Sequence, residues 1–297
     1  MKNPYFGRLL TAMVTPFTKD GVNLKATADL ADWLVKKGND GLVVEGSTGE
    51  AATMTLEEKK AVLQAVIDRV GKKCKVIVGA GTNSTQSTIE LIKALEPLKP
   101  DGFLVVGPYY NKPTQAGYFE HFRAVAESTK LPIIVYNVPG RTGSNILPAT
   151  VAKLAAQCKN IVAIKEAAGN VAQVAELYCL LPHDFTIYSG DDGLILPFMS
   201  VGATGLISVV GNICPKILNN LMDAYQEGQV REAAGLNAQM LPLAQAMFVE
   251  SNPIPVKYAV KKVTGINVGN PRLPLTPLSK DAVKVVDGVL KNFKLVK

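Results

Sequence analysis

Short, apolar runs rich in β-branched residues recur at regular intervals between residues 9 and 209 of this 297-residue chain. Most are continuous apolar stretches, which is typical of parallel strands buried on both faces. The predicted strands are Leu9–Val14, Gly41–Glu45, Lys75–Gly79, Gly102–Val106, Pro132–Tyr136, Ile161–Glu166, Phe185–Ser189 and Gly205–Val209.

Segments with a helical period separate these runs, as parallel strands require. The clearer ones are Ala26–Lys37, Leu56–Val70, Thr85–Leu95, Gln115–Ser128, Leu147–Ala156 and Val171–Leu181, with Thr55 and Thr114 as capping residues before two of them. Eight βα units without an obvious linker favour a closed (β/α)8 barrel over a doubly wound open sheet. After Ile213 the pattern is mostly helical, so we expect a barrel domain at residues 1–224 and a small helical extension at 225–297.

Composition narrows the class of protein. No apolar run reaches the roughly 18 residues of a membrane span, and Met1 to Arg8 lack the pattern of a secretory leader, so we expect a cytoplasmic protein. The net charge of +7 is spread along the chain, which does not suggest a nucleic-acid partner. With only His121 and His183, neither expected to end a strand, we expect no metal.

Reactive side chains cluster where the predicted strands end, which in a barrel is where chemistry is built. Lys165 is the strongest signal: period-two alternation places it with Ile161 and Ala163 on the inward face, and Val162 and Ile164 on the other. A lysine that loses hydration there has a lowered pKa and can attack a ketone as a free amine. The alternative is a structural lysine paired with a carboxylate.

Two other strand ends carry groups that suit this chemistry. Tyr136 ends the preceding strand, close enough for its phenol to exchange protons with atoms bonded to Lys165. Ser47 and Thr48 lie in a glycine-flanked turn whose hydroxyl and N–H groups could bind a carboxylate, although such turns are common.

A series of motifs, taken in order, resembles the dihydrodipicolinate synthase/N-acetylneuraminate lyase family across nearly the whole chain. They are TPF (15–17), GSTGE (46–50), PYYNKP (108–113), YNVPGRTG (136–143), IKEA (164–167), SGDD (189–192), GLISV (205–209) and NPIPVKYA (252–259). The resemblance implies condensation of pyruvate with aspartate semialdehyde, in lysine biosynthesis, through a covalent imine and without a cofactor. It also implies a homotetramer built from two dimers.

The resemblance assigns roles to individual residues. The implied catalytic residues are Lys165, which forms the imine, and a proton relay of Tyr136, Ser47 and Tyr110, the last from a neighbouring subunit. The implied substrate-binding residues are Thr48 for the pyruvate carboxylate, Arg141 for the carboxylate of the second substrate, and Gly190 and Ile207 in the pocket wall. A guanidinium suits a carboxylate better than an ammonium does.

Other functions stay open. One is cleavage of N-acetylneuraminate or of a 2-keto-3-deoxy sugar acid by the same imine chemistry, and serine at position 47, common among the lyases, is consistent with it. Another is a catalytically silent barrel that senses a keto acid, although binding alone needs no nucleophile.

Two residues depart from the family pattern. One is Ser47, where the synthases usually carry threonine, and the other is Glu45. Glu45 is an acid on the predicted inward face, without an evident partner. Asn83 and Tyr109 match residues that bind the inhibitor lysine in regulated members, but Leu56 and Ser87 stand where those members carry a histidine and a glutamate. We therefore expect weak or absent lysine inhibition, and half-inhibition at sub-millimolar lysine would contradict this.

Overall fold

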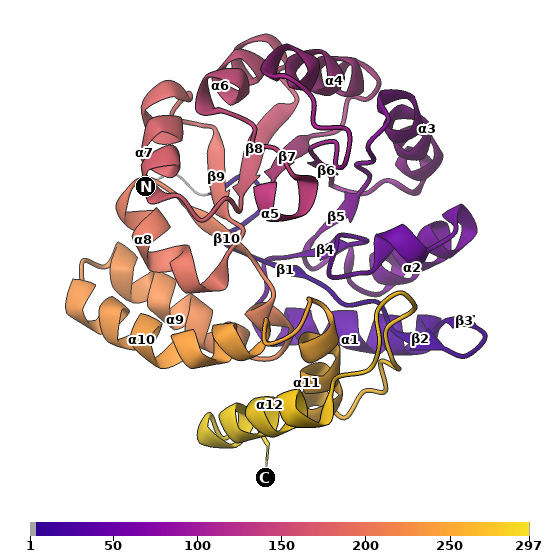
Figure 1. Cartoon of the computed structure of the whole chain (residues 1–297), viewed down its shortest axis with the longest axis vertical. Coiled ribbons are helices and arrows are strands. Elements are labelled where there is room, and N and C mark those ends of the chain that lie inside the picture. The colour runs from indigo at the N-terminus through magenta and orange to yellow at the C-terminus, as the bar shows by residue number, and fades with distance from the viewer. Residues whose placement is uncertain (1–3, 297) are drawn as a thin grey trace. The chain divides into compact units, whose positions relative to one another are not determined.

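Eight strands form a closed parallel barrel in the computed structural model, which describes residues 4–296 (Figure 1). Their order around the barrel is β1-β10-β9-β8-β7-β6-β5-β4, so the predicted (β/α)8 barrel is confirmed and the open sheet is excluded. The bounds are β1 Leu9–Ala12, β4 Gly41–Val44, β5 Lys75–Gly79, β6 Gly102–Val106, β7 Ile133–Asn137, β8 Ile161–Glu166, β9 Thr186–Ser189 and β10 Gly205–Ser208.

The predicted and observed strand ends differ by at most two residues, for local reasons. β4 stops at Val44 because Glu45 adopts a positive φ of 58°, which an extended strand does not allow. β1 was predicted to reach Val14, but the N–H of Val14 donates to the Asn212 side chain instead of to a neighbouring strand (3.2 Å). A short antiparallel pair, β2 (Phe17–Thr18) and β3 (Gly21–Val22), was not predicted.

The chain divides into two compact units, each of which draws on distant parts of the sequence. The first comprises Met1–Arg8 and Ile77–Ile207, and the second comprises Leu9–Val76 and Ser208–Lys297. The predicted domain boundary between residues 224 and 225 stays a prediction. Residues 1–3, which belong to the predicted leader-free N-terminus, and residue 297 lie outside the described residues.

In the first unit, helices cover the outer face of β6–β9 (Figure 1). These helices are α3 Thr85–Leu95, α4 Gln115–Glu127, α6 Pro148–Gln157, α7 Val171–Leu180 and α8 Ile195–Ser200, whereas the single turn α5 Pro139–Thr142, after β7, lies inside this layer. The predicted cap Thr114 accepts the N–H of Gly117, which fixes the start of α4. Fully buried side chains such as Phe103, Phe122 and Phe198 make the core of this unit.

The second unit holds the remaining helices: α1 Leu24–Lys36, α2 Leu56–Val70, α9 Pro215–Gln226, α10 Val230–Ala246, α11 Ile254–Thr264 and α12 Lys280–Asn292. Thr55 caps α2 as predicted, in a reciprocal capping box with Glu58. Phe17, Met54 and Val62 form a small buried cluster beside β2. Among the described residues, no helix has the length and apolar character needed to cross a membrane.

Close approach of two strand ends makes Gly81 sensitive to substitution. A Cβ atom there would lie 2.4 Å from the backbone nitrogen of Val106, whereas one at Gly288 of α12 would meet nothing within 4 Å. We expect Gly81→Ala to lower the free energy of unfolding by roughly 1–3 kcal/mol, as overpacking does. The control Gly288→Ala should raise it by up to about 1 kcal/mol, through helix propensity. Urea unfolding measures both, and an unchanged midpoint for Gly81→Ala would contradict the close approach.

Candidate active site

Strand β8 presents Lys165 and Glu166 to opposite faces. The Glu166 carboxylate accepts a hydrogen bond from Nε2 of Gln173 on α7 (2.9 Å), so its face of the strand meets the helix layer. Side chains alternate along a strand, which turns Lys165 away from that layer. This agrees with the orientation predicted from the sequence.

Lys165 lies directly against Tyr136 of the neighbouring strand. The two residues are register partners in the β7–β8 ladder. Nζ of Lys165 is 4.3 Å from the centroid of the Tyr136 ring, and both side chains are buried, with 6% and 7% of their surfaces exposed. The structure therefore brings together the two residues for which the sequence signal was strongest.

Burial changes the acid–base chemistry of Lys165. Desolvation lowers the pKa of its ammonium from 10.5 to about 8; the positive charge of Arg141 also lowers it, and the negative charge of Asp192 opposes the change. At pH 7 roughly one molecule in ten then holds the neutral amine, against about one in three thousand for an ordinary lysine. The neutral amine is the form that attacks a carbonyl carbon.

The two charges that act on Lys165 come from different elements. Arg141 is exposed and belongs to the single turn α5, and Asp192 is buried after β9. Within the SGDD motif, Asp191 makes a capping contact, in which its side chain accepts the N–H of Gly193 (2.9 Å). The role of Asp192 beside Lys165 was missed, because adjacent acids in a turn carry no signal that separates them.

Gly190 lies where a side chain would not fit. A Cβ atom on it would lie 2.7 Å from Cβ of Ala167 and 3.1 Å from Cε of Lys165. Its N–H also donates to the carbonyl of Glu166 (2.7 Å), which fixes its distance from β8. Ile207, the other predicted wall residue, is fully buried in β10.

A polar network holds the ends of β7 and β8 together on the helix side. The Glu166 carboxylate accepts from Asn137 Nδ2 (2.9 and 3.1 Å), Gln173 Nε2 (2.9 Å) and the N–H of Ala168 (2.7 Å). Burial raises the pKa of Glu166, and the hydrogen bond from Asn137 opposes this most strongly. Since Asn137 and Glu166 follow Tyr136 and Lys165 directly, the network fixes the strand ends that carry them. Sequence reasoning missed it, although polar residues ending two apolar runs were a visible signal.

The GSTGE loop lies in the second unit. Ser47 is exposed, whereas Thr48 is buried and its Oγ1 accepts a hydrogen bond from Nδ2 of Asn252 (2.9 Å). Within the loop, the N–H groups of Gly49 and Glu50 donate to the carbonyls of Gly46 and Ser47. Among residues 4–296, no acceptor is found for the N–H groups of Ser47 and Thr48. These two N–H groups and the Thr48 hydroxyl proton are suitable donors for an anion.

Glu45, before this loop, is a buried acid. The positive φ of Glu45 ends the alternation on which its predicted inward orientation rested. Neither carboxylate oxygen has a hydrogen-bond partner among the described residues. Burial raises its pKa well above 4.5, and the charge of Lys59 on α2 lowers it less strongly. Lys59 is thus its charged neighbour, which the sequence did not reveal.

The remaining predicted residues are in the first unit. Tyr110 is 89% exposed and has a positive φ of 76°, and Tyr109 is 39% exposed. The carbonyl of Asn83 accepts from Asn111 Nδ2 (2.7 Å). Among residues 4–296, no three His, Cys, Asp or Glu side chains are grouped to hold a metal ion.

A parallel barrel that buries a lysine of lowered pKa against a tyrosine defines a class: (β/α)8 enzymes in which a lysine amine serves as nucleophile. Comparison with known proteins gives the family. The model of the dihydrodipicolinate synthetase family matches residues 5–293, and the chain belongs to that family.

Individual relatives are similar over their whole length. The 4-hydroxy-tetrahydrodipicolinate synthase of Desulforamulus reducens is 46% identical over 98% of each chain. The dihydrodipicolinate synthase of Cyanidioschyzon merolae, solved with lysine bound, has a TM-score of 0.96 at 40% identity, covering 99% of this chain and 100% of that one. The chloride-inhibited Acinetobacter baumannii enzyme, solved with pyruvate, has a TM-score of 0.93 at 40% identity, covering 97% and 99%.

The buried ammonium of Lys165 should be a cost to stability. Below about pH 8 it is protonated in both the folded and the unfolded chain, so the full cost is present; between pH 8 and 10.5 the cost disappears as pH rises. We expect Lys165→Met to raise the free energy of unfolding at pH 7 by about 3 kcal/mol at most, with the gain lost above pH 10.5. Urea unfolding at several pH values measures this.

Lys153 offers a matched control, because its Nζ also lies over an aromatic ring, that of Phe119 (3.9 Å), but its side chain is exposed. Lys153→Met should leave stability nearly unchanged at every pH. A Lys165→Met protein that is less stable than the parent at pH 7 would contradict the burial cost.

Proposed function

We propose that the chain is a 4-hydroxy-tetrahydrodipicolinate synthase, which condenses pyruvate with L-aspartate 4-semialdehyde in lysine biosynthesis. The observation that carries the proposal is the buried Lys165 amine, whose pKa falls to about 8, against the Tyr136 ring. Relatives that carry this name match nearly the whole chain at 46–47% identity.

The first step is imine formation on Lys165. Its neutral amine attacks the keto carbon of pyruvate and gives a carbinolamine. Loss of water from this intermediate leaves a C=N double bond, and the departing oxygen needs a proton that a nearby phenol can supply. Support for Tyr136 as the proton donor comes from its ring, whose centroid lies 4.3 Å from Nζ of Lys165.

The second step forms the carbon–carbon bond. The imine withdraws electrons, so a proton leaves the pyruvate methyl group and an enamine forms. The enamine carbon attacks the aldehyde of the semialdehyde, whose oxygen takes up a proton. The amino group of the second substrate then attacks the imine carbon, closes the ring and releases Lys165 as a free amine. No cofactor takes part in this sequence, and Ser47 and Tyr110 complete the proton relay with Tyr136.

The GSTGE loop is proposed to bind the carboxylate of pyruvate. The N–H groups of Ser47 and Thr48 and the Thr48 hydroxyl proton are the donors that support this, because charge-assisted hydrogen bonds to N–H groups favour a carboxylate. Gly190 and Ile207 are proposed to line the pocket, Gly190 because nothing larger fits beside Lys165.

Arg141 is proposed to bind the carboxylate of aspartate semialdehyde. Its exposed guanidinium is close enough to lower the pKa of Lys165, so a carboxylate held there lies near the reacting amine. A bound carboxylate would also neutralise that charge during the reaction. This arrangement favours the four-carbon semialdehyde over a neutral sugar chain.

The exposed Tyr110 bears on the assembly of the enzyme. The Tyr110 side chain is 89% exposed, and its backbone has a positive φ of 76°, which is uncommon for a residue other than glycine. We propose that a neighbouring subunit receives it, in a homotetramer of two dimers, and that the enzyme acts in the cytoplasm. One similar structure is described as the first monomeric dihydrodipicolinate synthase variant.

Sugar-acid cleavage is the second candidate function, since Ser47 is common among the lyases of the family. Turnover of aspartate semialdehyde with pyruvate, compared with cleavage of N-acetylneuraminate and of 2-keto-3-deoxy acids, separates the two. Serine lacks the methyl group of threonine, so the side chain of Ser47 can adopt more rotamers. This freedom affects the proton relay in either reaction.

Chemical trapping tests the proposed function. Reduction with borohydride in the presence of pyruvate should fix one pyruvyl group per chain, and peptide mass mapping should place it on Lys165. Lys165→Ala should abolish both the adduct and the condensation of pyruvate with aspartate semialdehyde, by more than about a thousandfold. Lys153→Ala should retain both. An adduct on another lysine, or none at all, would overturn the proposal.

A further inference from the structure

The NPIPVKYA motif and the segment after it contact the GSTGE loop, and no step of the proposed reaction uses them. Asn252 contacts Thr48, while Lys257 and Arg272 both contact Glu50. These three residues are more than 200 positions away in sequence from the loop that they contact. All five belong to the second unit.

Glu50 is the centre of these contacts. It is 4% exposed and has a positive φ of 56°, which is costly for a side chain that is not glycine. One carboxylate oxygen accepts from Nζ of Lys257 (2.7 Å), and the other accepts from the backbone N–H of Arg272 (2.8 Å). Lys257 is 1% exposed, and its Nζ also lies over the Phe17 ring (4.3 Å). The turn at the end of the loop is therefore held from two sides.

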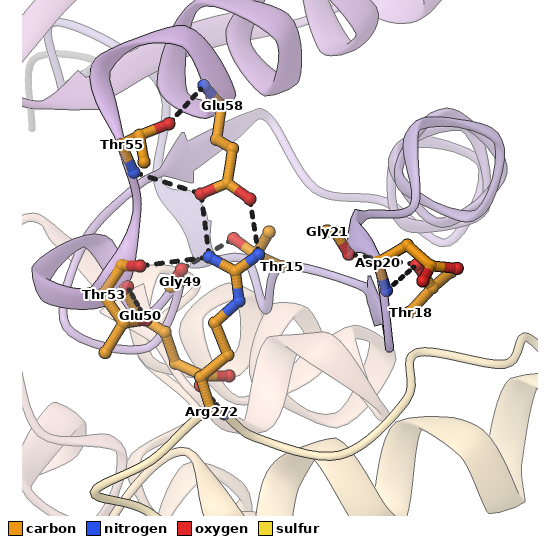
Figure 2. Close-up of polar contacts among 10 residues, drawn as sticks. All are labelled: Thr15, Thr18, Asp20, Gly21, Gly49, Glu50, Thr53, Thr55, Glu58 and Arg272. Carbon is orange, nitrogen blue, oxygen red and sulfur yellow. Dashed lines mark hydrogen bonds and ion pairs between the residues drawn. The ribbon is translucent and has the colours of Figure 1, made fainter.

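The Arg272 side chain extends the contact to the next element. Figure 2 shows its guanidinium between the carbonyl of Thr53 and the carboxylate of Glu58. Nη1 donates to Thr53 (3.0 Å) and to Oε2 of Glu58 (2.8 Å), and Nη2 bonds Oε1 of Glu58. Glu58 also accepts the N–H of Thr55 in the capping box, so Arg272 is tied to the first turn of α2.

Asn252 sets the direction of a hydroxyl proton. Its amide Nδ2 donates to Oγ1 of Thr48, which occupies Oγ1 as an acceptor. The hydroxyl proton of Thr48 must then point to another acceptor, such as the carboxylate of a keto acid. Figure 2 shows the hydrogen bond that the Thr15 hydroxyl donates to the carbonyl of Gly49, the next residue of the loop (2.7 Å).

We propose that Asn252, Lys257 and Arg272 are positioning residues that hold the GSTGE loop in its carboxylate-binding conformation. The inference rests on the proposed function, in which that loop binds pyruvate. A buried ion pair adds little stability compared with apolar residues of similar volume, but its directional bonds restrict the loop to one conformation. Affinity for pyruvate therefore depends on a C-terminal segment that does not touch the reacting atoms.

The test uses changes that keep side-chain volume. In Asn252→Asp, the new carboxylate accepts the Thr48 proton instead of donating to Oγ1, so the hydroxyl no longer faces a ligand. Lys257→Met removes the charge that holds Glu50. Lys262→Met is the matched control, because Lys262 lies on the same helix but pairs at 3.8 Å with Asp287 on α12, away from the loop.

Two readouts separate this inference from the proposed function. In borohydride trapping, Asn252→Asp and Lys257→Met should raise the half-saturating pyruvate concentration about tenfold or more, the loss expected for one hydrogen bond to a charged group. In both variants the KM for aspartate semialdehyde should stay within about twofold of the parent value. In Lys262→Met the half-saturating pyruvate concentration should also stay within about twofold of the parent value. In deuterium exchange, the amides of residues 46–55 should exchange faster in both variants and not in the control.

Several results would overturn the inference. Unchanged pyruvate dependence in folded variants, an equal rise for both substrates, or unchanged exchange in the loop each contradicts it. If the parent protein forms no adduct, the proposed function fails, and deuterium exchange alone then decides whether the segment holds the loop. If Lys257→Met does not fold, Arg272→Gln replaces it. The Arg272 side chain is 26% exposed, and the substitution keeps the backbone N–H that donates to Glu50. Slower loop exchange, or the pyruvate dependence of the parent, in Arg272→Gln would count against the inference.

Discussion

The structure depends on keeping one lysine amine out of water without neutralising it permanently. Lys165 is enclosed at the end of β8, where burial lowers the pKa of its ammonium to about 8. The negative charge of Asp192 opposes this change in pKa, and the positive charge of Arg141 adds to it. A closer carboxylate would make a stable ion pair and leave Lys165 unable to act as the proposed nucleophile. The site is therefore a balance between desolvation and nearby charge.

That balance needs accurate placement, which the strand ladder and the polar residues behind it provide. Register pairs Tyr136 with Lys165, and Asn137 with Glu166 on the helix side. The Glu166 carboxylate is satisfied by amide and backbone donors, so it does not compete for the ammonium of its neighbour. The same principle recurs in the second unit, where Glu50 is satisfied by Lys257 and Arg272 beside the GSTGE loop. In both places a buried carboxylate fixes backbone beside a proposed ligand-binding group.

Much of this could be predicted from the sequence, because periodicity is a local property. The strand Ile161–Glu166, the helix Leu56–Val70 and its Thr55 cap follow from apolar spacing and capping chemistry, and alternation alone gave the orientation of Lys165. Long-range partners could not be predicted: Asn252 with Thr48, Arg272 with Glu58 and Lys59 near Glu45 depend on how distant segments meet. The end of β4 was misplaced for a related reason, since a positive φ at Glu45 has no signal in residue type.

Direct titration of Lys165 tests the central claim. In protein labelled with 13Cε-lysine, the resonance missing from Lys165→Met assigns this side chain, and its chemical shift can be followed from pH 6 to pH 11. The burial of the amine predicts a midpoint near pH 8, as the structure gives. A midpoint near the ordinary lysine value of about 10.4 would show a hydrated or permanently paired ammonium, and the assigned nucleophile would then be wrong.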